Sequence, residues 1–124
     1  MNEILFRGKT VETKEWVFGF YNHCHWKGNK HTIRVQKDSH LEDHFIDPKT
    51  VGQYAGLEDK NGTKMFKGDI NLDWDFKKSE IVWYCGGFYF KYSELEYKAI
   101  GSIASYNYCI CGNIHDNPEL LEAN

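Results

Sequence analysis

Histidine and cysteine, the ligand types that zinc binds most often, gather in two short clusters of the sequence. These are His23-Cys24-His25 with His31, and Cys109-x-Cys111 with His115. Alternate residues of a strand point to the same side, so each cluster offers two ligands from one strand. Structural zinc sites instead use Cys pairs about two to four residues apart, closed by a turn around the metal. Cys109 and Cys111 also lie in an apolar segment, where free cysteine packs as a small hydrophobe. We therefore predict no metal site, with core thiols and solvated histidines instead.

Two groups of acidic residues have spacings that resemble cation sites. Residues 59–63 match the first ligands of a calcium-binding loop. The sixth position of that loop is Lys64 and its twelfth is Ile70, where a calcium loop requires Gly and Glu. Asp73 and Asp75 offer two carboxylates with no third ligand nearby, which is typical of a solvated edge or loop. Neither group predicts a cation site.

Known catalytic motifs do not occur in this chain. It contains no Gly-x-x-x-x-Gly-Lys phosphate loop, no His-Glu-x-x-His and no Gly-x-Ser-x-Gly. Five of the six histidines lie in the segment 23–44, the most polar stretch, without a paired nucleophile. We predict no catalytic residue, no enzyme and no cofactor, and the role of segment 23–44 stays open. A hydrolase or metal enzyme that uses these histidines is the third hypothesis.

The aromatic content is high, with four Trp, eight Tyr and eight Phe. A small domain does not easily bury so many rings, so we expect some at a subunit interface or a binding face. Phe88, Phe90 and Tyr92 alternate along one predicted strand, with Trp83 and Tyr84 opposite. Such rings can stack nucleic-acid bases, but alternating rings more often face a core or a partner. The single lysine among them offers little charge for a phosphate backbone.

Short alternating segments separated by turn residues dominate the chain and predict a mainly β fold. Tight hairpin turns are predicted at Asn61-Gly62 and Gly86-Gly87. The polar stretch 38–48 is predicted to be a loop, and 93–100 fits a short helix or a strand. The ranges predicted as strands are 16–21, 32–36, 51–57, 64–66, 68–74, 81–85, 88–92 and 109–114.

A short helix is predicted at the end of the chain, with Asn117 as its cap and Pro118 at its first position. The expected architecture is a small curled sheet or SH3-like barrel with β-hairpins and this helix. A length of 124 residues suits one domain over 1–124, or two tightly packed lobes of about 1–48 and 49–124.

Charge and hydropathy exclude several classes of protein. The formal net charge is −3 and only two residues are Arg, so no basic stripe for a phosphate backbone is visible. No apolar run approaches the ~20 residues that span a bilayer, and the first residues lack a secretory signal pattern. We therefore expect a cytoplasmic protein that does not contact membranes. Its cysteines would then be reduced thiols; they are Cys24, Cys85, Cys109 and Cys111.

Several blocks of the chain resemble, in order, motifs of the YopX family of phage and prophage proteins. They are FRGK at 6–9, EWVFG at 15–19, DPKTVGQYAGL at 47–57, DKNG at 59–62, FKGDI at 66–70 and GNIHDNPELL at 112–121. The resemblance implies a phage or prophage origin in a bacterial cytoplasm, a largely β fold and assembly into oligomers. It implies no activity and no site residue. Residues 21–45 follow no motif of the family.

Our leading hypothesis is a non-enzymatic binding or adaptor protein that acts through its aromatic β surface, by self-association or with a protein partner. The alternative is a small-barrel nucleic-acid-binding protein with a basic groove around Arg7, Lys9 and Arg34. Burial of all conspicuous rings in the core would contradict the leading hypothesis.

Overall fold

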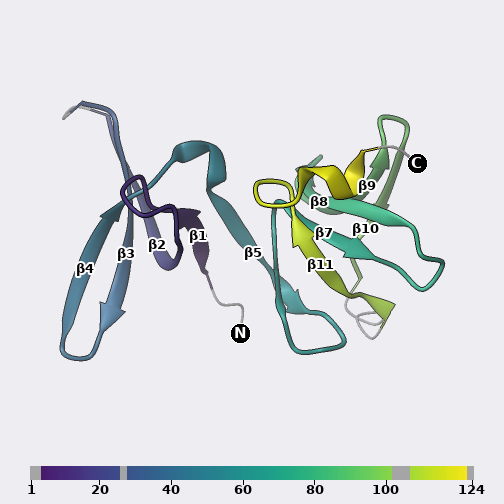
Figure 1. Cartoon of the computed structure of the whole chain (residues 1–124), viewed down its shortest axis with the longest axis horizontal. Coiled ribbons are helices and arrows are strands. Elements are labelled where there is room, and N and C mark those ends of the chain that lie inside the picture. The colour runs from purple at the N-terminus through teal and green to yellow at the C-terminus, as the bar shows by residue number, and fades with distance from the viewer. Residues whose placement is uncertain (1–3, 26–27, 102–106, 123–124) are drawn as a thin grey trace. The chain divides into compact units, whose positions relative to one another are not determined.

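The computed structural model describes residues 4–25, 28–101 and 107–122 of the 124-residue chain. The chain divides into two compact units, Met1–Tyr54 (unit 1) and Ala55–Asn124 (unit 2). The fold is mainly β, as predicted, and is built from antiparallel strands (Figure 1). Within the described ranges, no helix has the length and apolar character needed to cross a membrane.

Unit 1 contains the first strands of a six-stranded antiparallel sheet with the order β4-β3-β2-β1-β5-β6. The short helix η1 (Pro48–Thr50) precedes β5, and the Asp47 carboxylate caps it by accepting the Lys49 N–H. The strands are β1 (Phe6–Lys9), β2 (Trp16–Cys24), β3 (Lys30–Lys37), β4 (His40–Phe45) and β5 (Gly52–Glu58), whose later residues belong to unit 2.

The predicted loop at 38–48 is wrong for most of its length, because β4 occupies His40–Phe45. A two-residue turn joins Lys37 to His40, and Asp38 takes a positive φ of 48° in it. Polar side chains made this segment look like a loop. All of β4, however, pairs with residues Thr32–Lys37 of β3, which satisfies the backbone groups on that side of the strand.

A few apolar residues and close backbone approaches hold unit 1 together. Ile33 and Ile46 are buried, and a bridge between Thr10 and Ile46 links the end of β1 to the residue after β4. A Cβ on Gly8 would collide with the Ile46 side chain. A Cβ on Gly19 would collide with the backbone of β3, so β2 can pass β3 this closely only without a side chain there.

Unit 2 contains a five-stranded antiparallel sheet with the order β10-β9-β8-β7-β11, and a hairpin of β5 with β6. Neither sheet closes into a barrel among the described strands, so the SH3-like detail of the prediction is unconfirmed. The strands are β6 (Lys64–Phe66), β7 (Asp69–Leu72), β8 (Lys78–Tyr84), β9 (Gly87–Ser93), β10 (Glu96–Ala99) and β11 (Ile110–Asn113).

Local turn chemistry predicted both hairpins of unit 2 close to their observed positions. Gly62, with φ of 82°, closes the β5–β6 hairpin as expected. The β8–β9 turn is shifted by one residue from the prediction: Cys85 and Gly86 form it, both with positive φ. The open segment 93–100 contains strand β10. The strand predicted at 68–74 ends at Leu72, before an exposed loop.

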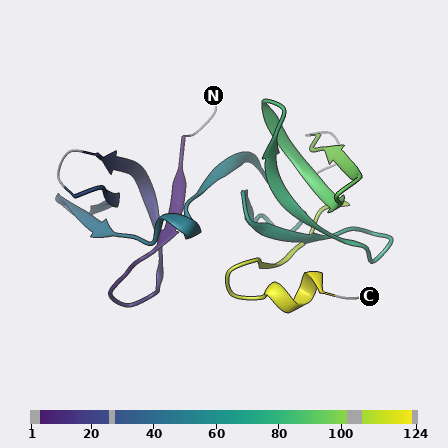
Figure 2. The ribbon, with the colours of Figure 1, turned by 90° about the horizontal axis from the view of Figure 1, so that it is seen from above.

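The core of unit 2 is formed by Met65, Ile81, Phe90 and Tyr108. The rings of Phe90 and Tyr108 meet edge to face at 4.8 Å. The C-terminal helix is a short 3-10 turn, η3 (Pro118–Leu121), which packs against β8 and appears in yellow in Figure 2. Asn117 is at the N-cap position and Pro118 begins the helix, as predicted, but the Asn117 side chain makes no capping hydrogen bond. Its side chain accepts the backbone N–H of Asn113 instead, at 3.2 Å.

Candidate functional site

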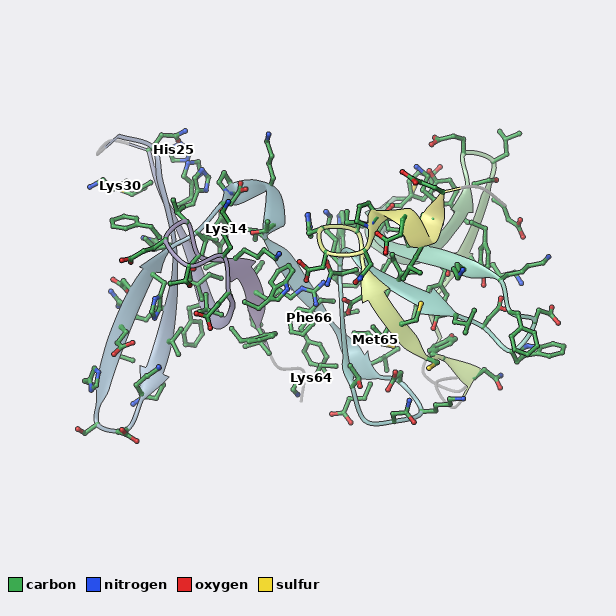
Figure 3. All side chains as sticks on the ribbon, viewed as in Figure 1. Lys14, His25, Lys30, Lys64, Met65 and Phe66 are labelled. Atoms are coloured by element: carbon green, nitrogen blue, oxygen red, sulfur yellow. The ribbon has the colours of Figure 1, made fainter. Side chains whose placement is uncertain are left out.

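The end of the β2–β3 hairpin gathers three of the predicted histidines. His23 lies opposite His31 in the strand register, and their rings stack at 3.8 Å. His25, which Figure 3 labels near Lys30, has its ring 3.9 Å from that of His23. The Tyr21 hydroxyl and His31 Nδ1 are hydrogen-bonded at 2.6 Å. Loss of hydration, followed by the charges of His23 and His25, lowers the pKa of His31.

No metal-binding arrangement forms in the described ranges, where no three His, Cys, Asp or Glu side chains are grouped to hold an ion. All four cysteines are free thiols. The prediction that Cys111 fills a core is wrong, because β11 carries a register shift between Ile110 and Gly112 and leaves that residue exposed. Partial burial still raises the pKa of the Cys111 thiol, which makes it a poor nucleophile.

The two remaining histidines of segment 23–44 lie on β4. His40 and His44 flank Glu42, and their Nε2 atoms lie 3.0 and 3.3 Å from its carboxylate oxygens. The hydrogen bond from His40 is the main cause of the lowered pKa of Glu42. The histidines of this segment thus fall into two separate groups on one sheet.

The acidic groups singled out in the sequence have structural roles. Asp59 is buried, and its carboxylate accepts three backbone N–H groups: from Asn61 and Thr63 at 2.9 Å and from Ile110 at 2.8 Å. Asp73 accepts two N–H groups of its own loop and the Tyr92 hydroxyl. These carboxylates are saturated by donors from the chain itself, so they organise turns.

The aromatic residues do not form the single platform that the sequence suggested. Phe90 is buried and Phe88 packs against the same core, with Trp83 edge-on to Phe88 at 4.9 Å. Tyr84 instead stacks on Tyr97 of β10 at 4.2 Å. The rings of β8 and β9 are therefore divided between the inside of unit 2 and its outer surface.

The basic groove required by the nucleic-acid hypothesis is not formed by the three predicted residues. Arg7 is buried, and its guanidinium carbon lies 4.5 Å from the centre of the Trp16 ring. The Lys9 ammonium lies 5.5 Å from the same ring. Arg34 makes a two-pronged contact with Asp43, with nitrogen–oxygen distances of 2.7 and 3.0 Å. Two of the three cations are thus buried or neutralised.

An exposed apolar surface lies on the sheet of unit 1. Phe20 pairs with Arg34, Arg34 with Asp43, and Thr32 with Phe45, so these side chains share one side of β2, β3 and β4. Leu41, two residues before Asp43, is on the same side. We call this surface the unit 1 face, and its large apolar residues are Phe20, Leu41 and Phe45.

All three of these apolar side chains are left in solvent. Their exposed fractions are 68% for Phe20, 54% for Leu41 and 56% for Phe45. The Arg34–Asp43 ion pair lies among them and lines, with Phe20, a depression of 340 Å³. The Lys30 ammonium lies 5.5 Å from the centre of the Phe45 ring. An apolar surface with a neutralised ion pair is suited to binding another protein.

Sequence reasoning found only part of this surface. It placed Phe20 on an alternating strand, but it assigned Leu41 and Phe45 to a loop. The available signal was the alternation of Leu41, Asp43 and Phe45, with Asp43 able to pair with the Arg34 of the preceding strand. The polar residues Glu42 and His44 between them concealed it.

The chain is a mainly β protein with two antiparallel sheets. Comparison with known proteins identifies its family. The family model described as YopX protein matches residues 5–122, so the chain belongs to the YopX family, as its motifs predicted. A search of curated proteins gives no match.

Two solved structures share the fold over nearly their whole length. The crystal structure of the protein EF1440 from Enterococcus faecalis is 24% identical, with a TM-score of 0.62, and the match covers 98% of this chain and 100% of that one. The X-ray structure of the protein yopX from Bacillus subtilis is 15% identical, with a TM-score of 0.60, and the match covers 100% and 99%.

Proposed function

We propose that this chain is a non-enzymatic binding module that docks a protein partner on the unit 1 face. The observation that carries the proposal is the exposure of Phe20, Leu41 and Phe45 on one side of strands β2, β3 and β4. Covering the exposed parts of these side chains with a partner yields roughly 0.8–2 kcal/mol each, scaled from about 1.5–3 kcal/mol for a full burial. The family resemblance adds a phage or prophage origin and a bacterial cytoplasm to this proposal.

The chemistry of the partner follows from the polar groups of the face. Asp43 already neutralises Arg34, and the hydrogen bond from Arg34 is the main cause of the lowered pKa of Asp43. A partner that covers the Arg34–Asp43 ion pair needs an apolar patch for the rings around it. It also needs hydrogen-bonding groups for the remaining donor and acceptor sites of Arg34 and Asp43, because burying an ion pair is costly unless it is fully hydrogen-bonded. A nucleic-acid backbone offers phosphates instead, and beside the neutralised Arg34 this face presents Lys30, whose single charge does little to hold a backbone.

The test compares two matched variants of the full chain. Phe20→Thr with Phe45→Thr removes two rings of the face and keeps β-branched residues, which suit strands. Trp83→Thr, on unit 2, removes an exposed ring elsewhere and is the control. Proteins retained by each chain from a bacterial lysate are identified by mass spectrometry, and the purified candidate is titrated calorimetrically.

We expect one purified protein to bind the wild type and the control with equal affinity. The double variant should bind at least about tenfold more weakly, since central aromatic residues contribute most of the affinity of an interface. Equal binding by the double variant would refute the site. Salt-sensitive quenching of Trp emission by single-stranded DNA would favour nucleic acid as the partner instead.

A further inference from the structure

Both sheets end in edge strands, and β4 is the edge strand with the most regular backbone. β10 and β11, at the edges of the unit 2 sheet, each contain a register shift. β6, at the other edge of the six-stranded sheet, is only 3 residues long. β4 has 6 residues, pairs with β3 without a register shift and contains no Pro or Lys (Figure 1). It therefore lacks the bulge, the proline and the lysine by which edges are commonly protected from another strand.

Alternate residues of β4 direct their backbone groups away from β3. The residue pair that closes a two-residue hairpin exchanges both of its hydrogen bonds, and so does every second pair along the ladder. Leu41 and Asp43 lie between these pairs, so their N–H and C=O groups point outward. The Phe45 carbonyl also points outward and accepts the Val11 N–H at 2.9 Å. Among the described residues, nothing pairs with the outward backbone groups of Leu41 and Asp43.

A depression of 490 Å³ lies on the outer side of β4, where the free edge ends. Asp43, Phe45 and Val11 form part of its wall, and Val11 is 60% exposed. Because Val11 already occupies the Phe45 carbonyl, the free edge consists of the backbone around Leu41 and Asp43. An extended segment that pairs with these two residues reaches the depression with a side chain two positions further along.

The charges of β4 indicate which segment fits this edge. Glu42 and Asp43 lie on opposite sides of the strand, and their side chains are 37% and 48% exposed. Apart from the histidines of β4, their cationic neighbours are Lys37 and Arg34, both on β3. These cations lie toward the inside of the sheet and leave the carboxylates at its edge. Glu12 adds a third carboxylate in the wall of the depression. A strand with basic residues opposite these carboxylates is complementary to the edge.

A second copy of β4 fits the same edge poorly. In an antiparallel pair, the residues whose backbone groups point outward bond to one another. In one register Leu41 pairs with Asp43, which places Glu42 opposite its own equivalent. In the next register Asp43 faces its own equivalent. Like charges directly opposite one another destabilise a strand pair, so the edge favours a segment of a different protein.

We propose that β4 binds an extended segment of another protein as an added antiparallel strand. The segment carries basic residues opposite Glu42 and Asp43, and apolar residues opposite Leu41 and at the depression. Its main-chain hydrogen bonds to Leu41 and Asp43 supply affinity, and its alternate side chains supply specificity. This inference deepens the proposed function and rests on it, because Leu41 and Phe45 belong to the unit 1 face.

The probe is a capped peptide of sequence Ser-Thr-Val-Thr-Lys-Lys-Val-Thr-Ser, titrated into the isotope-labelled full chain and followed by NMR. Its first Lys is designed to lie opposite Asp43, its second Lys opposite Glu42 and its second Val opposite Leu41. We expect saturable binding, with the Leu41 and Asp43 amides becoming protected from hydrogen exchange. A methyl group on the backbone nitrogen of the first Lys, which faces β4, should weaken binding at least about tenfold. The same methyl group on the second Lys, whose N–H faces away, should change binding by less than about twofold.

A charge exchange tests the predicted register. Replacing the second Lys of the peptide by Glu should weaken its binding to the wild type about threefold, and Glu42→Lys should restore it. Glu58→Lys is the matched control, because Glu58 is another exposed carboxylate on a strand, with the Lys64 ammonium 3.9 Å away. This control should bind both peptides as the wild type does. Thermal unfolding confirms that each variant is folded.

The outcomes separate this inference from the proposed function. No binding at peptide concentrations up to about 1 mM, or equal effects of the two methyl groups, overturns strand addition. Phe20 lies two strands from the edge, so Phe20→Thr should leave peptide binding unchanged. If the peptide fails while a lysate protein still depends on Phe20 and Phe45, only strand addition is refuted. If the peptide binds as expected and no lysate protein depends on these rings, the wider unit 1 face is refuted instead.

Discussion

Replacing Phe76 by Gly should stabilise the monomer, although it removes a large aromatic side chain. Phe76 occupies the left-handed region with φ of 64°, and its ring is 83% exposed. A residue with a Cβ is disfavoured by roughly 1–2 kcal/mol in this conformation relative to Gly. The substitution removes that strain.

Two smaller effects oppose the gain. Gly has more conformational freedom in the unfolded chain, which costs roughly 0.5–1 kcal/mol. The ring is only slightly buried, so a full burial worth about 1.5–3 kcal/mol scales down to roughly 0.3–0.5 kcal/mol lost. The expected net change lies between about −0.5 and +1.2 kcal/mol, centred on a small stabilisation. At the upper end this raises the melting temperature by about 3–5 °C for a chain of this length.

The assay is chemical and thermal unfolding at low micromolar protein. Phe76→Ala keeps the backbone strain and loses the ring, so it should be no more stable than the wild type. Gly86→Ala makes the reverse change in open space at φ of 81°, and should destabilise by about 1 kcal/mol. A loss of more than about 1 kcal/mol in Phe76→Gly would mean that the ring packs within the fold, and would refute the reasoning.

Two further predictions concern buried polar groups and pH. Asp59→Ala should lower the free energy of unfolding in urea by about 3 kcal/mol or more, because three backbone N–H groups lose a charged acceptor. A decrease below about 1 kcal/mol would contradict this. The lowered pKa of His31 means that the folded state resists its protonation, so the stability present above the unfolded pKa of 6.5 is lost as pH falls. The melting temperature should fall between about pH 7.5 and pH 5, and fall less in His31→Gln; an equal slope in both chains would exclude His31 as the cause.

The amino-acid sequence by itself determined the family, the mainly β class and the hairpin at Asn61–Gly62. Turn chemistry acts over a few residues, so a positive φ at Gly62 can be expected from local sequence alone. The family motifs, likewise, are read directly from residue order. Strand alternation also identified β2, β3 and β9 within a few residues of their ends.

Tertiary structure decided which side of each strand is covered, and this determines the candidate surfaces. Phe20 and Phe90 both alternate along strands, yet the first is exposed and the second buried. Period-2 alternation gives two faces without saying which one another element covers. Pairing of β4 with β3 turned an apparent loop into the strand that carries Phe45. Contacts distant in sequence, such as Arg34 with Asp43, arise only once that register is fixed, because no local preference encodes it.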